Sequence, residues 1–298
     1  MNVRSSSHFK FSKYQGAGND FVLMDLSYFT PPSDLSELAR RLCHRRLGIG
    51  ADGLLVLLPS SIADYRMRVF NADGSEPAMC GNGIRCLFDF IQKHKKGASE
   101  LSIETLFGVL KCRRVGEEIA VNLGSPSVTH WPIELSQGAA FVLDTGVPHA
   151  VLFVDALDSV SVAEEGRKVR LHPHFAPHGV NVNFVSVNPQ GKVTVRTYER
   201  GVEGETLACG TGAAAAAFVA MKQRNLTPPI CVLTRSVFEG EDIHYSQHIR
   251  FLFPRGASGE HEIEMLGSAE EVFTGVIIPK QPQNLAKGRV QSAENRRS

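Results

Sequence analysis

Two cysteines stand out because the residues around them are repeated in the two halves of the chain. Cys80 and Cys209 both lie in the pattern E-x-x-x-C-G-x-G. In each copy an apolar, β-branched run precedes the pattern, and an apolar run with helical spacing follows it. This order predicts a duplicated chain in which each thiol stands at the start of a helix.

A thiol at a helix N-terminus can act as an acid or a base. The unpaired backbone N–H groups and the positive end of the helix dipole lower the thiol pKa and bind an anion such as a carboxylate. If a pseudo-twofold axis relates the halves, Cys80 and Cys209 lie on opposite sides of one substrate. One thiol would then remove a proton from a carbon while the other supplies a proton from behind, which inverts that carbon. The helix N–H groups would stabilise the enediolate-like charge.

The other potential ligands and nucleophiles lack this duplicated context. We expect Cys43, Cys86, Cys112 and Cys231 to be core residues, because they form no C-x-x-C pair and are too sparse for a disulfide framework. Glu76 and Glu205, which repeat four residues before the cysteines, are expected to cap a helix or bind loop amides.

No cofactor or metal is expected. The histidines at 172, 174 and 178 are separated by prolines and suit a surface loop better than a metal site. A phosphate-binding G-x-x-x-x-G-K-[ST] segment is absent from the sequence, and Gly16-Ala17-Gly18 lacks the rest of a dinucleotide fingerprint.

At the cysteine motifs the sequence resembles the diaminopimelate epimerase family, and the resemblance spans roughly residues 10–280. It extends to four further segments: GAGNDF at 16–21, GIGADG at 48–53, NADGS at 71–75 and ERG at 199–201. It implies an α+β fold of two pseudo-symmetric domains, each a β-barrel-like sheet wrapped around a central helix, with the active site between them. It also implies a cofactor-independent epimerase that interconverts LL- and meso-diaminopimelate in lysine and peptidoglycan synthesis.

The resemblance assigns roles residue by residue. Cys80 and Cys209 match the catalytic acid/base pair, and His149 and Glu199 match positions that tune the cysteine pKa values. The positions that match substrate-binding residues are Asn19, Asn71, Gly81, Asn82, Asn181, Glu199, Arg200, Gly210 and Thr211. The charge of Arg200 suits a distal carboxylate, which a guanidinium can grip with two hydrogen bonds.

Two positions depart from the family pattern. Many members read Gly-Asn-Pro-His where residues 146–149 read Gly-Val-Pro-His, so Val147 replaces a substrate-contacting amide. A second amide position of some members falls at Gly53. We expect both residues to line the cleft. Two alternatives stay open: a racemase of proline, hydroxyproline or an acidic amino acid on the same fold, and a redox-sensing protein with a Cys80–Cys209 disulfide.

Apolar runs and turn signals predict the elements that position these residues. Strands are expected at 20–26, 53–58, 65–70, 101–110, 120–123, 150–154, 180–187 and 192–198, and helices at 34–48, 80–97 and from 209 through 221. The predicted domains are residues 1–126, completed by a strand at about 268–280, and residues 127–267. A flexible polar tail is expected at 281–298.

Composition limits the partners. The chain has 298 residues with 32 Lys plus Arg against 31 Asp plus Glu, which argues against a nucleic-acid or anionic-membrane partner. No apolar run approaches the roughly 20 residues that span a bilayer, and the first ten residues contain no signal-peptide core. We therefore expect a soluble, cytoplasmic protein that binds a small amino-acid substrate, and by resemblance a homodimer.

Overall fold

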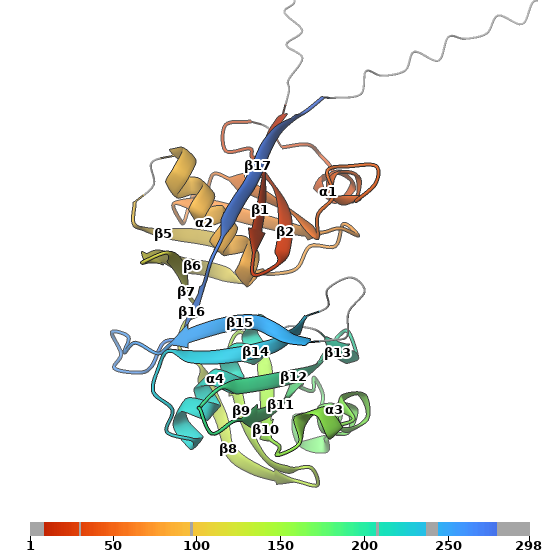
Figure 1. Cartoon of the computed structure of the whole chain (residues 1–298), viewed down its shortest axis with the longest axis vertical. Helices are drawn as coiled ribbons and strands as arrows, with labels where there is room; N and C mark the ends of the chain where they lie inside the picture. Colours follow the sequence, from red (N-terminus) through yellow and green to blue (C-terminus); the bar gives the residue numbers. More distant parts are fainter. Residues whose placement is uncertain (1–8, 30, 96–97, 207–208, 237–243, 279–298) are drawn as a thin grey trace, which may run out of the picture.

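The computed structural model describes residues 9–29, 31–95, 98–206, 209–236 and 244–278. The predicted tail at 281–298 and the end of the second predicted helix at 96–97 lie outside these residues. Figure 1 shows two lobes, the first half of the chain above and the second half below, which meet at β16 (Glu264–Gly267). No helix in the described ranges is long and apolar enough to span a membrane.

The strands form one continuous hydrogen-bonded sheet in which the same arrangement occurs twice. The first half contains β1 (Phe9–Gly16), β2 (Asn19–Asp25), β3 (Gly53–Leu58), β4 (Tyr65–Asn71), β5 (Glu100–Thr105), β6 (Gly108–Val115) and β7 (Glu118–Asn122). The second contains β8 (Ser127–Leu135), β9 (Gly138–Asp144), β10 (Pro148–Phe153), β11 (Asn181–Val187), β12 (Val193–Glu199), β13 (Gly204–Thr206), β14 (Ile230–Ser236), β15 (His244–Leu252) and β16. The final strand, β17 (Glu270–Ile277), returns to pair with β1.

The pairing order proves the duplication. In the first half β17, β1, β2, β3, β4, β5, β6 and β7 are neighbours in that order, with parallel pairs at β2–β3 and β4–β5. In the second half β8, β9, β10, β11, β12, β14, β15 and β16 follow the same order, with parallel pairs at β10–β11 and β12–β14. Pairing of β7 with β16 joins the two sheets. The last strand therefore occupies in the first half the place that β8 occupies in the second.

Each sheet packs against a central helix and an outer helix. The central helices are α2 (Gly81–Lys95) and α4 (Gly210–Gln223), and the outer helices are α1 (Leu35–Cys43) and α3 (Val162–Arg170). Residues 212–220 of α4 are all buried, because alanines on every side let six surrounding strands approach the helix. The prediction of a central helix buried within a sheet is confirmed.

A partly buried ion pair holds the loop before each cysteine. Arg68 of β4 donates two hydrogen bonds of 2.7 Å to Glu76, and Arg196 of β12 donates bonds of 2.7 and 2.8 Å to Glu205. Paired N–H donors matched to both carboxylate oxygens give this contact its geometric specificity. The repeated glutamates are therefore explained by repeated arginines, a partner that the sequence analysis missed.

Two predicted elements were wrong in extent. The helix expected over 34–48 ends at Cys43, because the returning chain donates N–H groups from Ile49, Gly50 and Ala51 to the carbonyls at its end. The strand expected over 101–110 is a hairpin of β5 and β6, and Thr105 turns it by accepting the N–H groups of Phe107 and Gly108. The other predicted strands match observed strands within two residues.

Candidate active site

Cys209 caps the N-terminus of α4. Its backbone is extended, with φ of −126°, and its Sγ accepts the N–H of Gly212 at 3.4 Å. The hydroxyl of Thr211 lies 3.4 Å from the same sulfur. The thiol therefore faces hydrogen-bond donors at the positive end of the helix, as expected from the sequence.

Cys80 occupies the matching position before α2, but its surroundings differ. Its Sγ accepts the N–H of Gly83 at 3.4 Å, and its carbonyl accepts the N–H of Ile84 at 2.9 Å. On its other side the sulfur lies 3.9 Å from Oδ1 of Asn19. This amide oxygen is an acceptor, so this one contact favours the protonated thiol.

Burial dominates the protonation of both thiols. Contrary to the lowered pKa expected at a helix N-terminus, burial raises the pKa of Cys80 and of Cys209 above the ordinary thiol value, because the charged thiolate loses water. For Cys80 the N–H groups of α2 and the Arg85 guanidinium oppose this rise. For Cys209 the Thr211 hydroxyl and the N–H groups of α4 oppose it, whereas Glu199 adds to it.

Glycines let each helix start touch the sheet beneath it. A Cβ on Gly83 would lie 2.8 Å from Leu55, and a Cβ on Gly212 would lie 2.4 Å from Asn183. Both distances are far inside van der Waals contact. The final glycine of each motif is therefore a packing requirement that fixes the sulfur over the sheet.

Two of the predicted asparagines, Asn19 and Asn82, contact each other beside Cys80. Asn82 donates to Oδ1 of Asn19 at 3.5 Å, and Nδ2 of Asn19 donates to Asp52 at 2.8 Å. Asn71 lies opposite Gly53 across β3 and β4, and its amide donates to Ser75 at 2.9 Å. Gly53 is buried, and a Cβ there would lie 2.7 Å from the carbonyl of Phe70.

Arg85 is fully buried and has no acidic partner within hydrogen-bond reach among the described residues. Its guanidinium donates to Oδ1 of Asn82 at 2.7 Å and to the carbonyls of Gly81 and Ser268. It therefore fixes the orientation of the Asn82 amide and places a positive charge close to Cys80.

The second half gathers the residues expected to tune Cys209 and to bind substrate. Asn181 accepts the N–H of Arg200 at 2.8 Å and donates to the carbonyl of Pro148 at 3.2 Å. This places Arg200 next to the 146–149 segment that contains Val147 and His149. Val147 is half-buried, and Gly210 is the first residue of α4.

His149 is fully buried, and Nε2 lies 3.0 Å from Oγ1 of Thr211. Burial, with a smaller contribution from the Arg200 charge, lowers the pKa of His149 to about 3. The imidazole is therefore neutral at physiological pH, and it reaches Cys209 through the Thr211 hydroxyl rather than directly.

Phe107 connects the two cysteine-bearing turns, and nothing in the sequence pointed to it. Its N–H donates to the carbonyl of Ala78, two residues before Cys80, at 3.1 Å. Its ring occupies the space beside Gly146, where a Cβ would lie 2.1 Å from Cε2. The neighbouring Thr145 donates to the carbonyl of Thr211 at 2.9 Å, so contacts run from one turn to the other.

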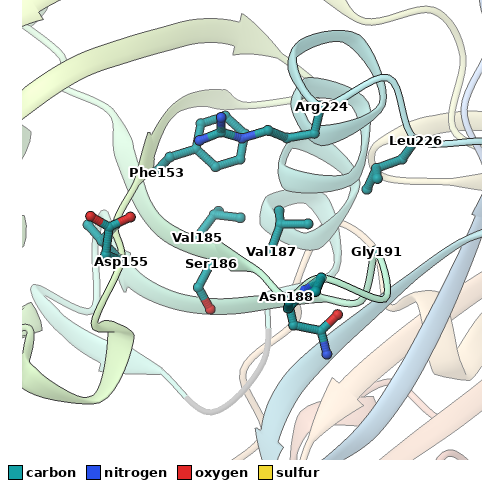
Figure 2. Close-up of a pocket in the computed structure, with 11 residues that line it drawn as sticks. Phe153, Asp155, Val185, Ser186, Val187, Asn188, Gly191, Arg224 and Leu226 are labelled. Atoms are coloured by element: carbon teal, nitrogen blue, oxygen red, sulfur yellow. The ribbon is translucent and has the colours of Figure 1, made fainter.

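The groove in Figure 2 lies at the other end of α4. It has a volume of about 440 Å³ and is lined by residues of β10, β11 and the segment after α4, with Arg224 stacked 4.6 Å from the Phe153 ring centre. None of the predicted site residues lines it. Within the described ranges, no three His, Cys, Asp or Glu side chains gather to hold a metal ion.

Comparison with known proteins assigns the chain to a family. The sequence profile described as diaminopimelate epimerase matches residues 11–129 and 141–236, which include both cysteine motifs. The chain belongs to the diaminopimelate epimerase family. It is 42% identical to the diaminopimelate epimerase of Archaeoglobus fulgidus over 90% of this chain and 95% of that protein. It is 38% identical to that of Elusimicrobium minutum over 90% of this chain and 99% of that protein.

More distant structures share the fold of this epimerase family. A PhzF-family phenazine biosynthesis protein from Bacillus anthracis superimposes with a TM-score of 0.65 at 17% identity, covering 92% of this chain and all of that one. A hydroxyproline epimerase from Agrobacterium vitis gives a TM-score of 0.59 at 18% identity, covering 94% and 95%. These likenesses confirm the α+β, duplicated fold.

The buried His149 predicts a pH dependence of stability. The unfolded imidazole titrates near pH 6.5, but the folded one stays neutral down to about pH 3, so unfolding takes up a proton below pH 6.5. We expect this group to lower the free energy of unfolding by about 2 kcal/mol between pH 6.5 and 5. Urea titrations at several pH values measure the slope. The His149→Gln variant should lack the contribution of His149 to this slope. Equal slopes in the two proteins would refute the low pKa of His149.

Proposed function

We propose that the chain interconverts LL- and meso-diaminopimelate without a cofactor, with Cys80 and Cys209 as the acid/base pair. The enzyme is an isomerase of the diaminopimelate epimerase family. The observation that carries the residue assignment is that the two repeated thiols cap the two central helices, and each accepts the N–H of a glycine three residues on.

The reaction follows from this placement. In one direction the Cys209 thiolate removes the α-proton, so the C–H bond breaks and an S–H bond forms. The electron pair moves into the carboxylate, and the N–H groups at the starts of α2 and α4 stabilise the resulting enediolate. The Cys80 S–H then breaks as its proton bonds to the opposite face of the carbon. The thiols exchange protonation states, and the reverse reaction exchanges them back.

Charge favours a substrate with a second ionised end. Glu199 and Arg200 are adjacent at the end of β12, and Arg200 is held by Asn181 beside the His149 segment. A carboxylate on the distal end would pair with Arg200, and an ammonium with Glu199. Proline and hydroxyproline have no second charged end to use this pair. Val147 lacks the amide hydrogen bond of many relatives, so the selectivity of the distal end rests more heavily on charge.

The organisation of the molecule enters the proposal as well. We propose the domains as residues 1–126, completed by a strand at about 268–280, and residues 127–267, with the substrate bound between them. The pairing of β17 with β1 supports the assignment of the last strand. A cytoplasmic homodimer, as the family resemblance implies, completes the proposal.

Proton exchange tests the function directly. The reduced protein is incubated with LL-diaminopimelate in deuterated water without added cofactor, and proton NMR follows the α-position. Loss of the α-proton signal together with formation of the meso isomer is the expected result. Unchanged LL-diaminopimelate would refute the substrate. Glutamate, aspartate, proline and hydroxyproline serve as comparison substrates, and comparable turnover of any of them would refute selectivity.

A further inference from the structure

The two halves differ at three buried positions beneath the cysteines. Asn183 pairs with Thr197 across β11 and β12, and Leu55 pairs with Val69 at the equivalent position of β3 and β4. His149 lies opposite Asn181 in the parallel pair β10–β11, as Phe21 lies opposite Gly53 in β2–β3. The trio His149, Asn183 and Thr197 thus stands where the first half has Phe21, Leu55 and Val69.

Apolar residues fill these three positions in the first half, so the fold itself does not require polar residues at them. Asn183 and His149 are completely buried, and a buried polar group costs free energy unless it is hydrogen-bonded. A connected set of hydrogen bonds offsets this free-energy cost, and the set occurs only in the half that holds Cys209. Because the first half has no equivalent set, we expect these polar residues to act on the Cys209 thiol.

The hydrogen bonds run in one direction. The amide of Asn183 is oriented by its neighbours: Nδ2 donates to the carbonyl of Ala150 at 3.3 Å, and Oδ1 accepts from Thr197 at 3.0 Å. The second Nδ2 hydrogen therefore points at Nδ1 of His149, 3.0 Å away. A backbone carbonyl can only accept, so the reversed amide would lose the bond to Ala150.

This contact settles the proton on the imidazole. Nδ1 accepts from Asn183, so the neutral ring carries its hydrogen on Nε2 and donates it to Oγ1 of Thr211 at 3.0 Å. The Thr211 hydroxyl then has its own hydrogen free for the sulfur of Cys209, 3.4 Å away. Of the charged groups in the described structure, Glu199 acts on Cys209 and Arg200 acts on His149.

We propose that Asn183 is a positioning residue that fixes the tautomer of His149, so that the Thr211 hydroxyl donates to the sulfur of Cys209. The inference rests on the proposed role of Cys209 as an acid/base group. It adds an asymmetry to the pair: the sulfur of Cys209 faces a hydroxyl donor, which favours its thiolate, whereas the sulfur of Cys80 faces the Asn19 oxygen, which favours its thiol.

The test measures each thiol alone. The rate of alkylation by iodoacetamide against pH gives the pKa of Cys209 in a Cys80→Ala background and that of Cys80 in a Cys209→Ala background. Asn183→Leu, which installs the residue of the first half, should raise the pKa of Cys209 by about one unit, a tenfold loss of thiolate at neutral pH. The pKa of Cys80 should not change. An unchanged Cys209, or an equal change in both thiols, would overturn the proposal.

Two further measurements do not depend on that variant folding. Nitrogen-15 NMR of His149 in the otherwise native protein should show hydrogen on Nε2 and none on Nδ1, and the opposite tautomer or an imidazolium contradicts the proposal. Thr211→Ser should keep the pKa of Cys209, and Thr211→Val should raise it as Asn183→Leu does. None of these readouts uses a substrate, so a failed assay with diaminopimelate leaves them independent.

Discussion

Replacing either Cys80 or Cys209 by alanine is expected to abolish epimerisation, with a fall in kcat of at least about a thousandfold. Inversion needs one group to take a proton and another to give one from the opposite face, so a single remaining thiol cannot complete it. Hydrogen–deuterium exchange at the α-carbon separates the two steps. Each variant should exchange, if at all, only the isomer whose α-proton faces its remaining thiol.

Cys86→Ala is the matched control for this loss. Cys86 lies on α2, six residues after Cys80, but it is fully buried and burial raises its pKa to about 12, so it supplies no thiolate. Its removal should leave kcat within about twofold while costing some stability through a small cavity. Comparable activity loss in Cys86→Ala, or retained epimerisation in either single variant of the repeated cysteines, would contradict the two-thiol mechanism.

Helices and strands could be predicted where their burial leaves a hydrophobic pattern in the sequence. The strand at 53–58 is a continuous apolar run because both of its faces are covered, and α4 is apolar all round for the same reason. The strand at 65–70 alternates apolar residues with the half-buried Arg66 and Arg68. The strand β8 was missed because none of its side chains is fully buried and Pro132 interrupts the alternation of Trp131, Ile133 and Leu135. The helix α3 was missed because Gly166, which lets the helix approach Tyr198 closely, interrupts an already short pattern.

The site could be predicted where it is duplicated and not where the halves diverge. The repeated motif identifies both thiols, and the helix starts follow from it. Asn183 has no motif, and only the alignment of β11 with β3, which needs the observed register, shows it to be a polar replacement of Leu55. Phe107 lies in a turn inside an apolar run that reads as one strand. Its contact with Gly146 joins the two halves, and a contact between residues so far apart in the chain leaves no pattern in the local sequence.

Removing the Arg200 guanidinium is expected to impair substrate binding more than chemistry. In Arg200→Met the distal carboxylate loses a charged partner that can form a bidentate hydrogen bond. We expect kcat/KM for diaminopimelate to fall about a hundredfold, mainly through a higher KM. Arg200→Lys keeps the charge but not the paired donors, so an intermediate loss of about tenfold is expected. Steady-state kinetics of all three proteins at one pH provide the comparison.

Arg224→Met separates this effect from a general loss of positive charge. Arg224 is exposed and stacks on Phe153 beyond the C-terminal end of α4, whereas Cys209 caps the N-terminal end. Its replacement changes the net charge equally and should leave kcat/KM within about twofold. Loss of Arg200 also removes one influence that lowers the pKa of His149, but burial is the larger cause, so the imidazole stays neutral near pH 7. A fall in kcat at unchanged KM in Arg200→Met would therefore place Arg200 with the thiols rather than at the distal end of the substrate.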